Sequence, residues 1–550
     1  MSIQASPRRD RAAPLLDEED ERDAEEPALA QRFSIKSELW IMFNLGWPMV
    51  ISFICRIGMA STDTAFVGHL TNTSHGTFLE DTYSAKDYLA AASLSDMVVN
   101  ILIVPPLAFN QVLNALVGQA LGSGNKKMAG TWLQLSMFFV ATTYVPFLAI
   151  QYFFVADALK LLGFPHPICE LAGVYARWNL FWPIPNGLYQ CMRFYFQAQG
   201  MPRPAMYNNL IFLLVNGLLN WIFVFGGPFQ YLAHGWHGFG FVGAAMSIST
   251  SRCLQPLAYW LYMFVYKKAH RDTWPGSTGE FLRCDRVKSF MQQALPLIGT
   301  LIFQSVSGQV TTLLIAQLGD LIIAASSAVS AATQVASSGL SAAFTAVAAV
   351  RIGYHLGRGD AHAAKTAMWL VVSASVASTV LIVAVLWPLR WQLCEMITDD
   401  AKTLPVAVMV VAAAFVGAGL SQIVSIGTSG VLSGQGRTFV TTLLSFGFEL
   451  PTSIGGTALL VYVAKLRGPD GLLWITWASA GFSLVEILVL AVVILCCGSW
   501  ARYAKEAQER QEAAVAAAQE ATPAASASDD TPASGGTVAP LVAPADKDES

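Results

Sequence analysis

The sequence predicts an all-α, polytopic membrane protein with twelve transmembrane helices in two similar six-helix bundles. Three observations lead to this: an apolar composition, uncharged runs of membrane-spanning length, and motifs that recur in both halves. Of the 550 residues, 54% are hydrophobic and 13% are charged, and the mean hydropathy is +0.48. A soluble domain carries about 25% charged residues, so this composition indicates a chain that lies mostly in lipid.

Nearly uncharged runs give the predicted helices. A helix of about 20 residues crosses a hydrocarbon core of about 30 Å, and every run reaches that length. The few charges fall mainly between the runs, so we interpret those islands as loops. The predicted spans are 38–67, 88–114, 131–155, 168–196, 205–227, 241–266, 288–318, 326–350, 364–389, 404–432, 438–463 and 472–497.

The two halves of the chain repeat. The sequence LGSGN at 121–125 follows the second predicted helix, and LGRGD at 356–360 follows the eighth. Gln-Gly pairs at 199–200 and 435–436 follow the fourth and tenth helices. An even number of helices in each half makes this a parallel repeat, related by an axis along the membrane normal, and places a substrate between the bundles near the midplane.

The predicted organisation follows from this repeat and from the polar ends. Residues 1–36 are polar and acidic without an apolar core, so we expect no cleavable signal peptide. The final residues begin in helical proportion and become rich in Ala, Ser, Pro and Asp, a composition that favours disorder. The expected parts are a disordered acidic tail at 1–37, an N-lobe at 38–266, a linker at 267–287, a C-lobe at 288–497 and a mostly disordered tail at 498–550.

Basic residues of the short loops predict the orientation. They concentrate on the side that holds both termini, for example at Lys126, Lys127 and 267–288, so the positive-inside rule places both termini in the cytosol. Asn72, in a glycosylation sequon, then lies in the first non-cytosolic loop. The membrane is expected to be the plasma membrane or a vacuolar or other endomembrane.

Composition also limits the partners. The formal charge of −4 gives no reason to expect nucleic-acid binding, and the eight cysteines lack the spacing of a zinc site or disulfide scaffold. The histidines fall mostly in predicted loops, and we find no hydrolase-like pair of acids or Ser/His/Asp group. We therefore expect a non-enzymatic monomer in the lipid bilayer with no metal and no cofactor.

Several short motifs occur in a fixed order through both halves. They are Pro48 followed by TDTAFVGHL at 62–70, LAAA at 89–92, GQALG at 118–122, FQAQG at 196–200 with Pro204, VRIG at 350–353 with LG at 356–357, and SGVL at 429–432 with GQG at 434–436. In this order they resemble the multidrug and toxic compound extrusion (MATE) family, particularly its eukaryotic branch. The resemblance implies two six-helix bundles in a V, alternating access, and export of small organic substrates against an inward H⁺ or Na⁺ gradient.

Asp63 is the leading candidate for ion coupling. An ionised acid inside a bilayer costs several kcal/mol, so such a group is a functional candidate by default. Asp63 with Thr64 is similar to the amino-lobe aspartate that bacterial and archaeal relatives use for cation coupling. The alternative is that Asp63 lies near the outer loop and caps a helix end.

Arg56 complicates the role of Asp63. It lies seven residues earlier on the same helical face, about 10.5 Å along the axis. A permanent ion pair would make Asp63 a poor proton carrier, whereas an unpaired Arg56 could hold an anionic substrate group. Because side chains lean toward the helix N-terminus, Arg56 would have to fold back to reach Asp63, so a shared hydrated cavity is favoured over a direct bond.

Other polar residues of the N-lobe are expected to face the same interior. Asp96 and Asn100 lie one turn apart on the second helix. Asn216 and Asn220 on the fifth helix are similar to amide positions in MATE relatives. Interior amides also bond helices to one another, and that reading remains open for each of them.

The C-lobe departs from the eukaryotic MATE pattern, which places glutamates on helices seven, eight and ten. Here those positions read Gln304, Gln309, Ala332 and Gln422. An amide keeps hydrogen bonds but cannot titrate, so we expect the glutamines to line a substrate path and coupling to depend on Asp63. Glu449 on helix eleven and Glu486 on helix twelve are secondary acid candidates, unless they lie at wet helix ends.

Two other functions remain open. A flippase of the same superfamily, moving lipid-linked sugars, would need a cavity ringed with arginines; besides Arg56, the sequence offers Arg193 and Arg252 at undetermined depth. An uncoupled or transport-dead protein that only binds its substrate is consistent with the missing glutamates.

Overall fold

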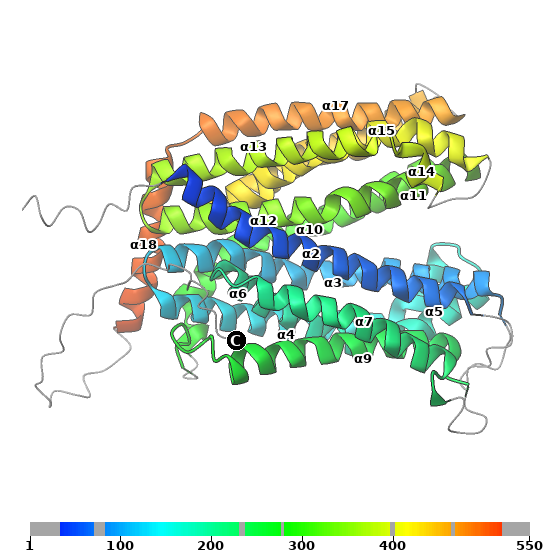
Figure 1. Cartoon of the computed structure of the whole chain (residues 1–550), viewed down its shortest axis with the longest axis horizontal. Helices are drawn as coiled ribbons and strands as arrows, with labels where there is room; N and C mark the ends of the chain where they lie inside the picture. Colours follow the sequence, from blue (N-terminus) through cyan, green and yellow to red (C-terminus); the bar gives the residue numbers. More distant parts are fainter. Residues whose placement is uncertain are drawn as a thin grey trace, which may run out of the picture.

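The computed structural model describes residues 34–70, 83–229, 237–276, 280–395, 402–463 and 468–519. Within these ranges the chain forms helices and short connections, without a strand. The helices run roughly parallel along the long axis of the molecule, and α18 lies across them at one end, which we call the α18 end (Figure 1).

The first six helical runs form the N-lobe. Their elements are α2 (Ile35–Gly68), α3 (Ala85–Gly122), α4 (Lys126–Leu161), α5 (His166–Trp178) with η2 (Asn179–Phe181) and α6 (Pro183–Ala198), α7 (Arg203–Phe225), and α9 (Gly240–Trp260) with η3 (Leu261–Tyr266). The fourth run is interrupted at Pro183, whose missing N–H cannot continue the helical hydrogen bonds.

The C-lobe repeats this plan with more irregular helices. Its elements are η4 (Glu280–Leu282), α10 (Cys284–Ala316), α11 (Asp320–Thr333) with η5 (Gln334–Ser338) and α12 (Gly339–Gly357), α13 (Ala361–Leu386), α14 (Arg390–Glu395), α15 (Thr403–Ser425) with η6 (Ile426–Leu432), α16 (Thr438–Leu444) with η7 (Ser445–Gly456) and η8 (Leu459–Val463), and α17 (Gly468–Leu495). The short α18 (Trp500–Gln519) follows. Four of the C-lobe elements are π-helical, namely η5, η6, η7 and η8.

The predicted runs match these helices, although many helices are longer at their ends. The run predicted at 88–114 is α3, which covers Ala85–Gly122. In the described part, eight helical segments are long and apolar enough by themselves to cross a membrane. The other predicted spans are broken into shorter helices or contain polar interior residues that lower their mean hydropathy. Hydropathy reports only the length in contact with lipid, so helical ends that project beyond it were missed.

The internal repeat has a structural basis at the α18 end. Gly124, between α3 and α4, and Gly359, between α12 and α13, both adopt positive φ, at 80° and 81°. The next residue caps the following helix in each half: Asn125 accepts a hydrogen bond from the backbone N–H of Met128, at 3.2 Å, and Asp360 from that of Ala363, at 2.8 Å. The repeated sequence therefore encodes the same tight turn twice.

The lobes exchange their first helices at the α18 end. Met42, Leu45 and Met49 from the first half of α2 belong to the hydrophobic core of the C-lobe. Phe290 and Ala294 from the first half of α10 belong to the core of the N-lobe. Since α2 and α10 are equivalent in the repeat, each lobe contributes one helix that crosses to the other.

Close backbone packing between α3 and α12 reinforces this contact. A Cβ at Gly118 would lie 2.8 Å from the carbonyl oxygen of Val350, and one at Gly353 would lie 2.9 Å from that of Ala115. Side chains at Gly122 and Gly357 would overlap the opposite backbone. Both helices thus carry a GxxxG spacing, which lets helix backbones approach closely. The two lobes are packed tightly together at the α18 end.

The helix α18 adds a contact to both lobes. Trp500, Tyr503 and Ala507 are buried in the C-lobe core. Arg510 donates a hydrogen bond to Gln119 Oε1 of α3, at 3.2 Å, and another to the Gln435 carbonyl, at 3.5 Å. The start of the C-terminal tail is thus helical as expected; the predicted disorder of the tails falls mostly on residues outside the described ranges.

Candidate functional site

Asp63 lies in the interior of the N-lobe, where α2 meets α7. Its side chain is 7% exposed. Its Oδ1 accepts hydrogen bonds from Asn216 Nδ2, at 2.7 Å, and Asn220 Nδ2, at 2.8 Å. Three residues that the sequence analysis selected separately thus meet at one point.

The geometry argues against a helix cap at Asp63. The helix α2 continues to Gly68, with His69 as its C-cap residue, and acids stabilise the N-terminal end of a helix, not its C-terminal end. The Oδ1 atoms of Asn216 and Asn220 are buried and accept no hydrogen bond within the described part of the chain. Spare carboxyl and amide oxygens can accept a proton or contact a small cation, so the cluster offers acceptors for an ion.

Arg56 forms no ion pair with Asp63. No described carboxylate lies within 4.0 Å of the Arg56 guanidinium. Arg252 is the cation whose electrostatic interaction reaches Asp63. Asp96 interacts electrostatically with both Asp63 and Arg252, but its side chain and that of Asn100 are exposed. Asp63 is therefore neither solvated by bulk water nor bonded to Arg56.

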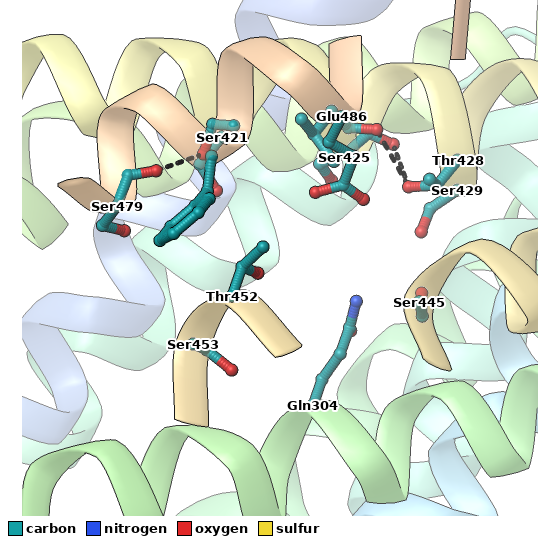
Figure 2. Close-up of a pocket in the computed structure, with 13 residues that line it drawn as sticks. Gln304, Ser421, Ser425, Thr428, Ser429, Ser445, Thr452, Ser453, Ser479 and Glu486 are labelled. Carbon is teal, nitrogen blue, oxygen red and sulfur yellow. Dashed lines mark hydrogen bonds between the residues drawn. The ribbon is translucent and has the colours of Figure 1, made fainter. Parts of the chain in front are cut away.

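The C-lobe contains a cavity lined by hydroxyl groups (Figure 2). Its volume is about 230 Å³, and an adjoining cavity of about 370 Å³ shares six of its lining residues. Gln304 reaches it from α10 and Glu486 from α17 (Figure 2). The hydroxyl-bearing residues of the first cavity are Ser421, Ser425, Thr428, Ser429, Ser445, Thr452, Ser453, Ser479 and Ser483.

Only part of the predicted C-lobe path lies at this cavity. Gln304 lines it, whereas Gln309 is exposed and is not among the residues lining either cavity. Gln422 is 2% exposed, and its Nε2 donates to Ser375 Oγ at 2.6 Å. Gln422 lines neither cavity in this structure, and its amide instead joins α15 to α13.

The remaining candidates have different outcomes. Glu486 lines the cavity as the acid on α17, so of the two secondary acids it is the one that the structure places at a candidate site. The side chain of Glu449 lies outside the described residues, as does Asn72. Ala332, at the third family glutamate position, is buried in a hydrophobic core. No group of three metal-ligating side chains occurs in the described ranges.

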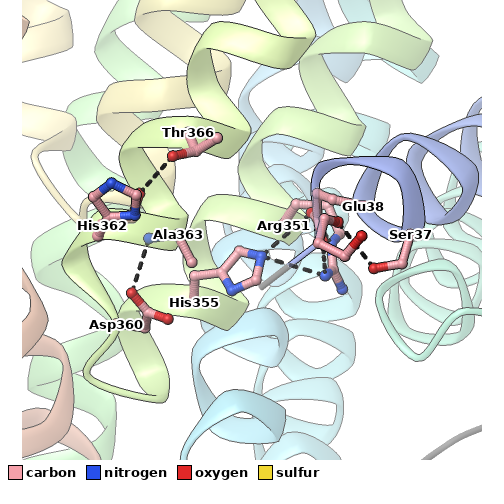
Figure 3. Close-up of polar contacts among 9 residues, drawn as sticks. Ser37, Glu38, Arg351, His355, Asp360, His362, Ala363 and Thr366 are labelled. Carbon is pink, nitrogen blue, oxygen red and sulfur yellow. Dashed lines mark hydrogen bonds and ion pairs between the residues drawn. The ribbon is translucent and has the colours of Figure 1, made fainter. Parts of the chain in front are cut away.

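A buried ion pair lies at the α18 end (Figure 3). Arg351 of α12 donates from Nε to Glu38 Oε1, at 2.7 Å, and from Nη2 to Oε2, at 2.6 Å. The Nε2 atom of His355 lies 3.2 Å from Glu38 Oε1. Glu38 is on α2, so the pair connects the first helix of the N-lobe to the C-lobe. We call Glu38, Arg351 and His355 the latch.

The sequence analysis missed the latch because Arg351 falls one residue beyond the predicted span 326–350, among the charges interpreted as loops. One signal was present: Glu38 is an acid at the very start of an apolar run, where a partner from another helix is needed. The sequence also left open the depths of Arg193 and Arg252. Arg193 is 1% exposed and Arg252 is half-buried, so both are interior residues of the N-lobe.

Comparison with known proteins shows which family this chain matches. A family model described as MatE matches residues 48–222 and 296–455. An uncharacterised transporter of Schizosaccharomyces pombe is 26% identical over 437 residues, covering 78% of this chain and 75% of its own. A probable multidrug resistance protein NorM of Acinetobacter baylyi is 26% identical over 473 residues, covering 84% and 97%.

A solved structure supports the same fold. The crystal structure of the eukaryotic MATE transporter AtDTX14 superposes with a TM-score of 0.74 at 18% identity, covering 86% of this chain and 99% of that one. At this identity the likeness concerns the fold alone, and it confirms the all-α architecture of twelve transmembrane helices.

Proposed function

The chain belongs to the MatE family of membrane transporters, and from that premise we propose that it is a secondary active antiporter that exports small organic molecules by alternating access. The family resemblance expected from the motifs is confirmed, and the protein is a multi-pass membrane transporter rather than an enzyme. The proposal adds the reaction: an inward H⁺ or Na⁺ flow that drives the substrate out.

The observation that carries the proposal is the buried Asp63 between two amides. A carboxylate that accepts two hydrogen bonds without an ion pair is costly in a dry interior, and binding a proton or a sodium ion removes that cost. Loading also weakens the bonds from Asn216 and Asn220, since hydrogen bonds to a charged acceptor are about twice as strong as neutral ones. The ion therefore changes how firmly α2 is held to α7.

The shape of α2 offers a route from this ion to the opposite end of the protein. Its second half carries Asp63 in the N-lobe, and its first half packs in the C-lobe core with Glu38 in the latch. Loosening the second half of α2 from α7 changes how the first half of α2 is held in the C-lobe. The packing of the two lobes at the α18 end changes with it. The proposed role of Asp63 is thus to make this packing depend on the bound ion.

The remaining parts of the proposal follow the sequence. Both termini lie in the cytosol, so the α18 end is the cytosolic end, and the protein acts as a monomer in the plasma membrane or an endomembrane. The hydroxyl-lined C-lobe cavity with Gln304 and Glu486 contacts the substrate. H⁺ or Na⁺ is the coupling ion and no other cofactor takes part.

Transport into proteoliposomes tests the proposal. Outward-directed pH and sodium gradients, with the ion concentrated inside the vesicle, are imposed separately over cationic, neutral and anionic organic substrates, with wild type and Asp63→Asn compared at equal reconstitution. We expect one gradient to drive accumulation and Asp63→Asn to abolish it. Asp157→Asn is the matched control, since Asp157 is an exposed acid with 70% of its side chain accessible. Undiminished accumulation by Asp63→Asn would remove Asp63 from the mechanism.

Two other functions give different results in the same experiment. A lipid-linked flippase is favoured by the interior positions of Arg193 and Arg252, and it would move a fluorescent lipid between leaflets without an ion gradient. An uncoupled protein would bind substrate and accumulate none under either gradient.

A further inference from the structure

Three arginines lie inside the N-lobe without acidic partners. Arg56 is on α2, Arg193 on α6 and Arg252 on α9. Arg193 is 1% exposed, and the other two are half-buried. In the described part of the chain none of the three forms an ion pair within 4.0 Å. Arg193 and Arg252 are both near enough to Arg56 to interact with its charge, so the three form one cluster.

Arg193 is the least satisfied member of this cluster. Its guanidinium lies 5.0 Å from the ring centroid of Phe53 and 4.7 Å from that of Phe194. Its Nε and Nη1 atoms are buried and have no hydrogen-bond partner among the described residues. Two cation–π contacts contribute about 2 kcal/mol each when desolvated, whereas burying an ion costs several kcal/mol. Because arginine keeps its proton in proteins, an anionic partner is needed.

Contacts of the neighbouring residues hold the cluster together. Phe53 lies one turn before Arg56 on α2, so the stacking of Arg193 on Phe53 brings α6 to the face that carries Arg56. On the other side, Tyr189 Oη of α6 and Gln255 Nε2 of α9 both donate to Asn209 Oδ1 of α7, each at 2.8 Å. Tyr189 and Gln255 are each about one turn from an arginine of the cluster.

The spare hydrogen-bonding groups in this region include several donors. Asn209 Oδ1 accepts two bonds, and its amide nitrogen is a donor that is buried without a partner in the described ranges. Arg252 Nε is also buried and unpartnered there, with its guanidinium 5.8 Å from the Trp182 ring centroid. Donors from α6, α7 and α9 therefore lack an acceptor.

The charges of the interior are unbalanced. Arg252 interacts with Asp63 and Asp96, which lie toward the other end of the N-lobe. Three guanidinium groups against two carboxyl groups leave at least one positive charge, and the excess rises when Asp63 takes up a cation. An anion beside Arg56 and Arg193 would balance it.

We propose that Arg56, Arg193, Arg252 and Asn209 bind the carboxylate, sulfonate or phosphate group of an anionic or zwitterionic organic ligand. This inference rests on the proposed export function and assigns its substrate class. Arginine suits such groups because its fork of N–H donors matches their paired oxygens. Arg56 is half-buried and Arg193 is 1% exposed, so Arg56 is the more accessible of the two.

Equilibrium binding to the full-length protein in nanodiscs tests the site without any gradient. Fluorescein serves as the anionic probe and rhodamine 6G as the cationic one, with fluorescence polarisation as the readout. We expect fluorescein to bind, and Arg56→Gln and Arg252→Gln each to weaken it at least tenfold without a matching loss for rhodamine 6G. Arg177→Gln is the matched control, because Arg177 also stacks on a ring, 5.8 Å from the Tyr152 centroid, but is exposed.

Thermal stability separates a binding role from a structural one. Arg193→Met keeps the apolar stem and removes an unsatisfied charge, so it should raise or preserve the melting temperature while fluorescein binding is lost. A fall in melting temperature together with unchanged fluorescein binding by all three arginine variants would overturn the proposal.

Two further comparisons identify the source of the anion and separate a failure of this site from a failure of antiport. If nanodiscs with phosphatidic acid abolish fluorescein binding and pure phosphatidylcholine restores it, the ligand is a lipid headgroup; insensitivity to lipid indicates a soluble organic anion. Fluorescein binding without gradient-driven accumulation supports the site and rejects antiport. Gradient-driven accumulation of rhodamine 6G with no binding of fluorescein supports antiport and rejects the site.

Discussion

Glu38 and Arg351 form a bidentate ion pair between α2 and α12, with Nε–Oε1 and Nη2–Oε2 distances of 2.7 and 2.6 Å. The pair is well shielded, since the side chains are 4% and 12% exposed. It lies at the α18 end, where α3 and α12 also pack through glycines. Because α2 crosses from the N-lobe into the C-lobe core, this pair fixes the first half of α2 to α12, and its loss should loosen the contact between the lobes at the α18 end.

Glu38→Gln should open the α18 end. The substitution leaves Arg351 buried without its counter-charge, which costs the closed state about 3 kcal/mol, or roughly two powers of ten in the ratio of closed to open molecules. Pulsed EPR distances between labels on Lys127 and Lys365 measure that ratio once exposed Cys284, Cys496 and Cys497 are replaced by Ser.

The double variant Glu38→Gln with Arg351→Gln completes the comparison. It leaves no uncompensated charge, so it should open the α18 end less than the sum of the two single variants. Glu170→Gln is the matched control: Glu170 pairs with Lys160 at 2.9 Å but is 57% exposed, and exposed pairs contribute about 0–1 kcal/mol. Identical distance distributions for Glu38→Gln and Glu170→Gln would contradict the latch.

The glycine contact between α3 and α12 gives a second prediction. Gly122→Ala and Gly357→Ala each place a methyl group against the opposite backbone, so the closed state should lose about 1–3 kcal/mol. The same EPR distance should lengthen in both variants. Gly308→Ala and Gly481→Ala are controls, because a Cβ at either position meets no atom within 4 Å. Lengthening in the controls alone would disprove the assignment.

The two C-lobe glutamines should respond differently to a charge. Gln304→Glu places a carboxylate in a cavity lined by hydroxyl groups, so the affinity for rhodamine 6G should increase about tenfold, a gain of 1.4 kcal/mol. Gln422→Glu instead removes the donor to Ser375 in the packed interior and should lower the free energy of unfolding by about 1–3 kcal/mol without tighter binding.

Fluorescence polarisation and thermal unfolding together check this pair of variants. On the sequence alone we expected both glutamines to bind substrate, and the structure separates them. If Gln422→Glu binds rhodamine 6G more tightly than wild type, or if Gln304→Glu does not, the cavity does not contact the ligand.

Much of the fold could be predicted because it follows from local chemistry. Apolar length predicts each span, and the repeated turn residues Gly124 with Asn125 and Gly359 with Asp360 predict where helices end and restart. The contact of Asp63 with Asn216 and Asn220 could be predicted in part, since each is a polar residue in an apolar run. Burial forces such groups to find partners, although the sequence did not say which ones.

Contacts between distant segments could not be predicted in this way. Glu38 and Arg351 are separated by 313 positions, and nothing in either local sequence selects the other. The side of α15 on which Gln422 lies was also undetermined, because α15 is apolar all round and its periodicity defines no face. Similarly, the depth of Arg193 depends on how α6 is tilted against α2, which hydropathy does not report.

The last prediction concerns α18, which contacts both lobes. Trp500 and Tyr503 anchor it in the C-lobe core, whereas Arg510 donates to Gln119 of the N-lobe at 3.2 Å. Arg510→Ala should therefore leave α18 docked but remove its contact with α3. A hydrogen bond from a charged donor contributes about 1.5–3 kcal/mol, so the open fraction at the α18 end should rise about tenfold or more.

EPR distances and thermal unfolding distinguish this effect from loss of the helix. Truncation after Gly498 also exposes the apolar surface that Trp500 and Tyr503 cover, so it should lower the melting temperature, whereas Arg510→Ala should not. Arg502→Ala is the matched control, because Arg502 lies on the same helix, is 75% exposed and, within the described part of the chain, pairs with nearby Glu506. If Arg510→Ala and Arg502→Ala leave the same open fraction, α18 only covers the C-lobe. If Arg510→Ala alone increases the open fraction, α18 holds the two lobes together, and its contact with α3 must break before the lobes move.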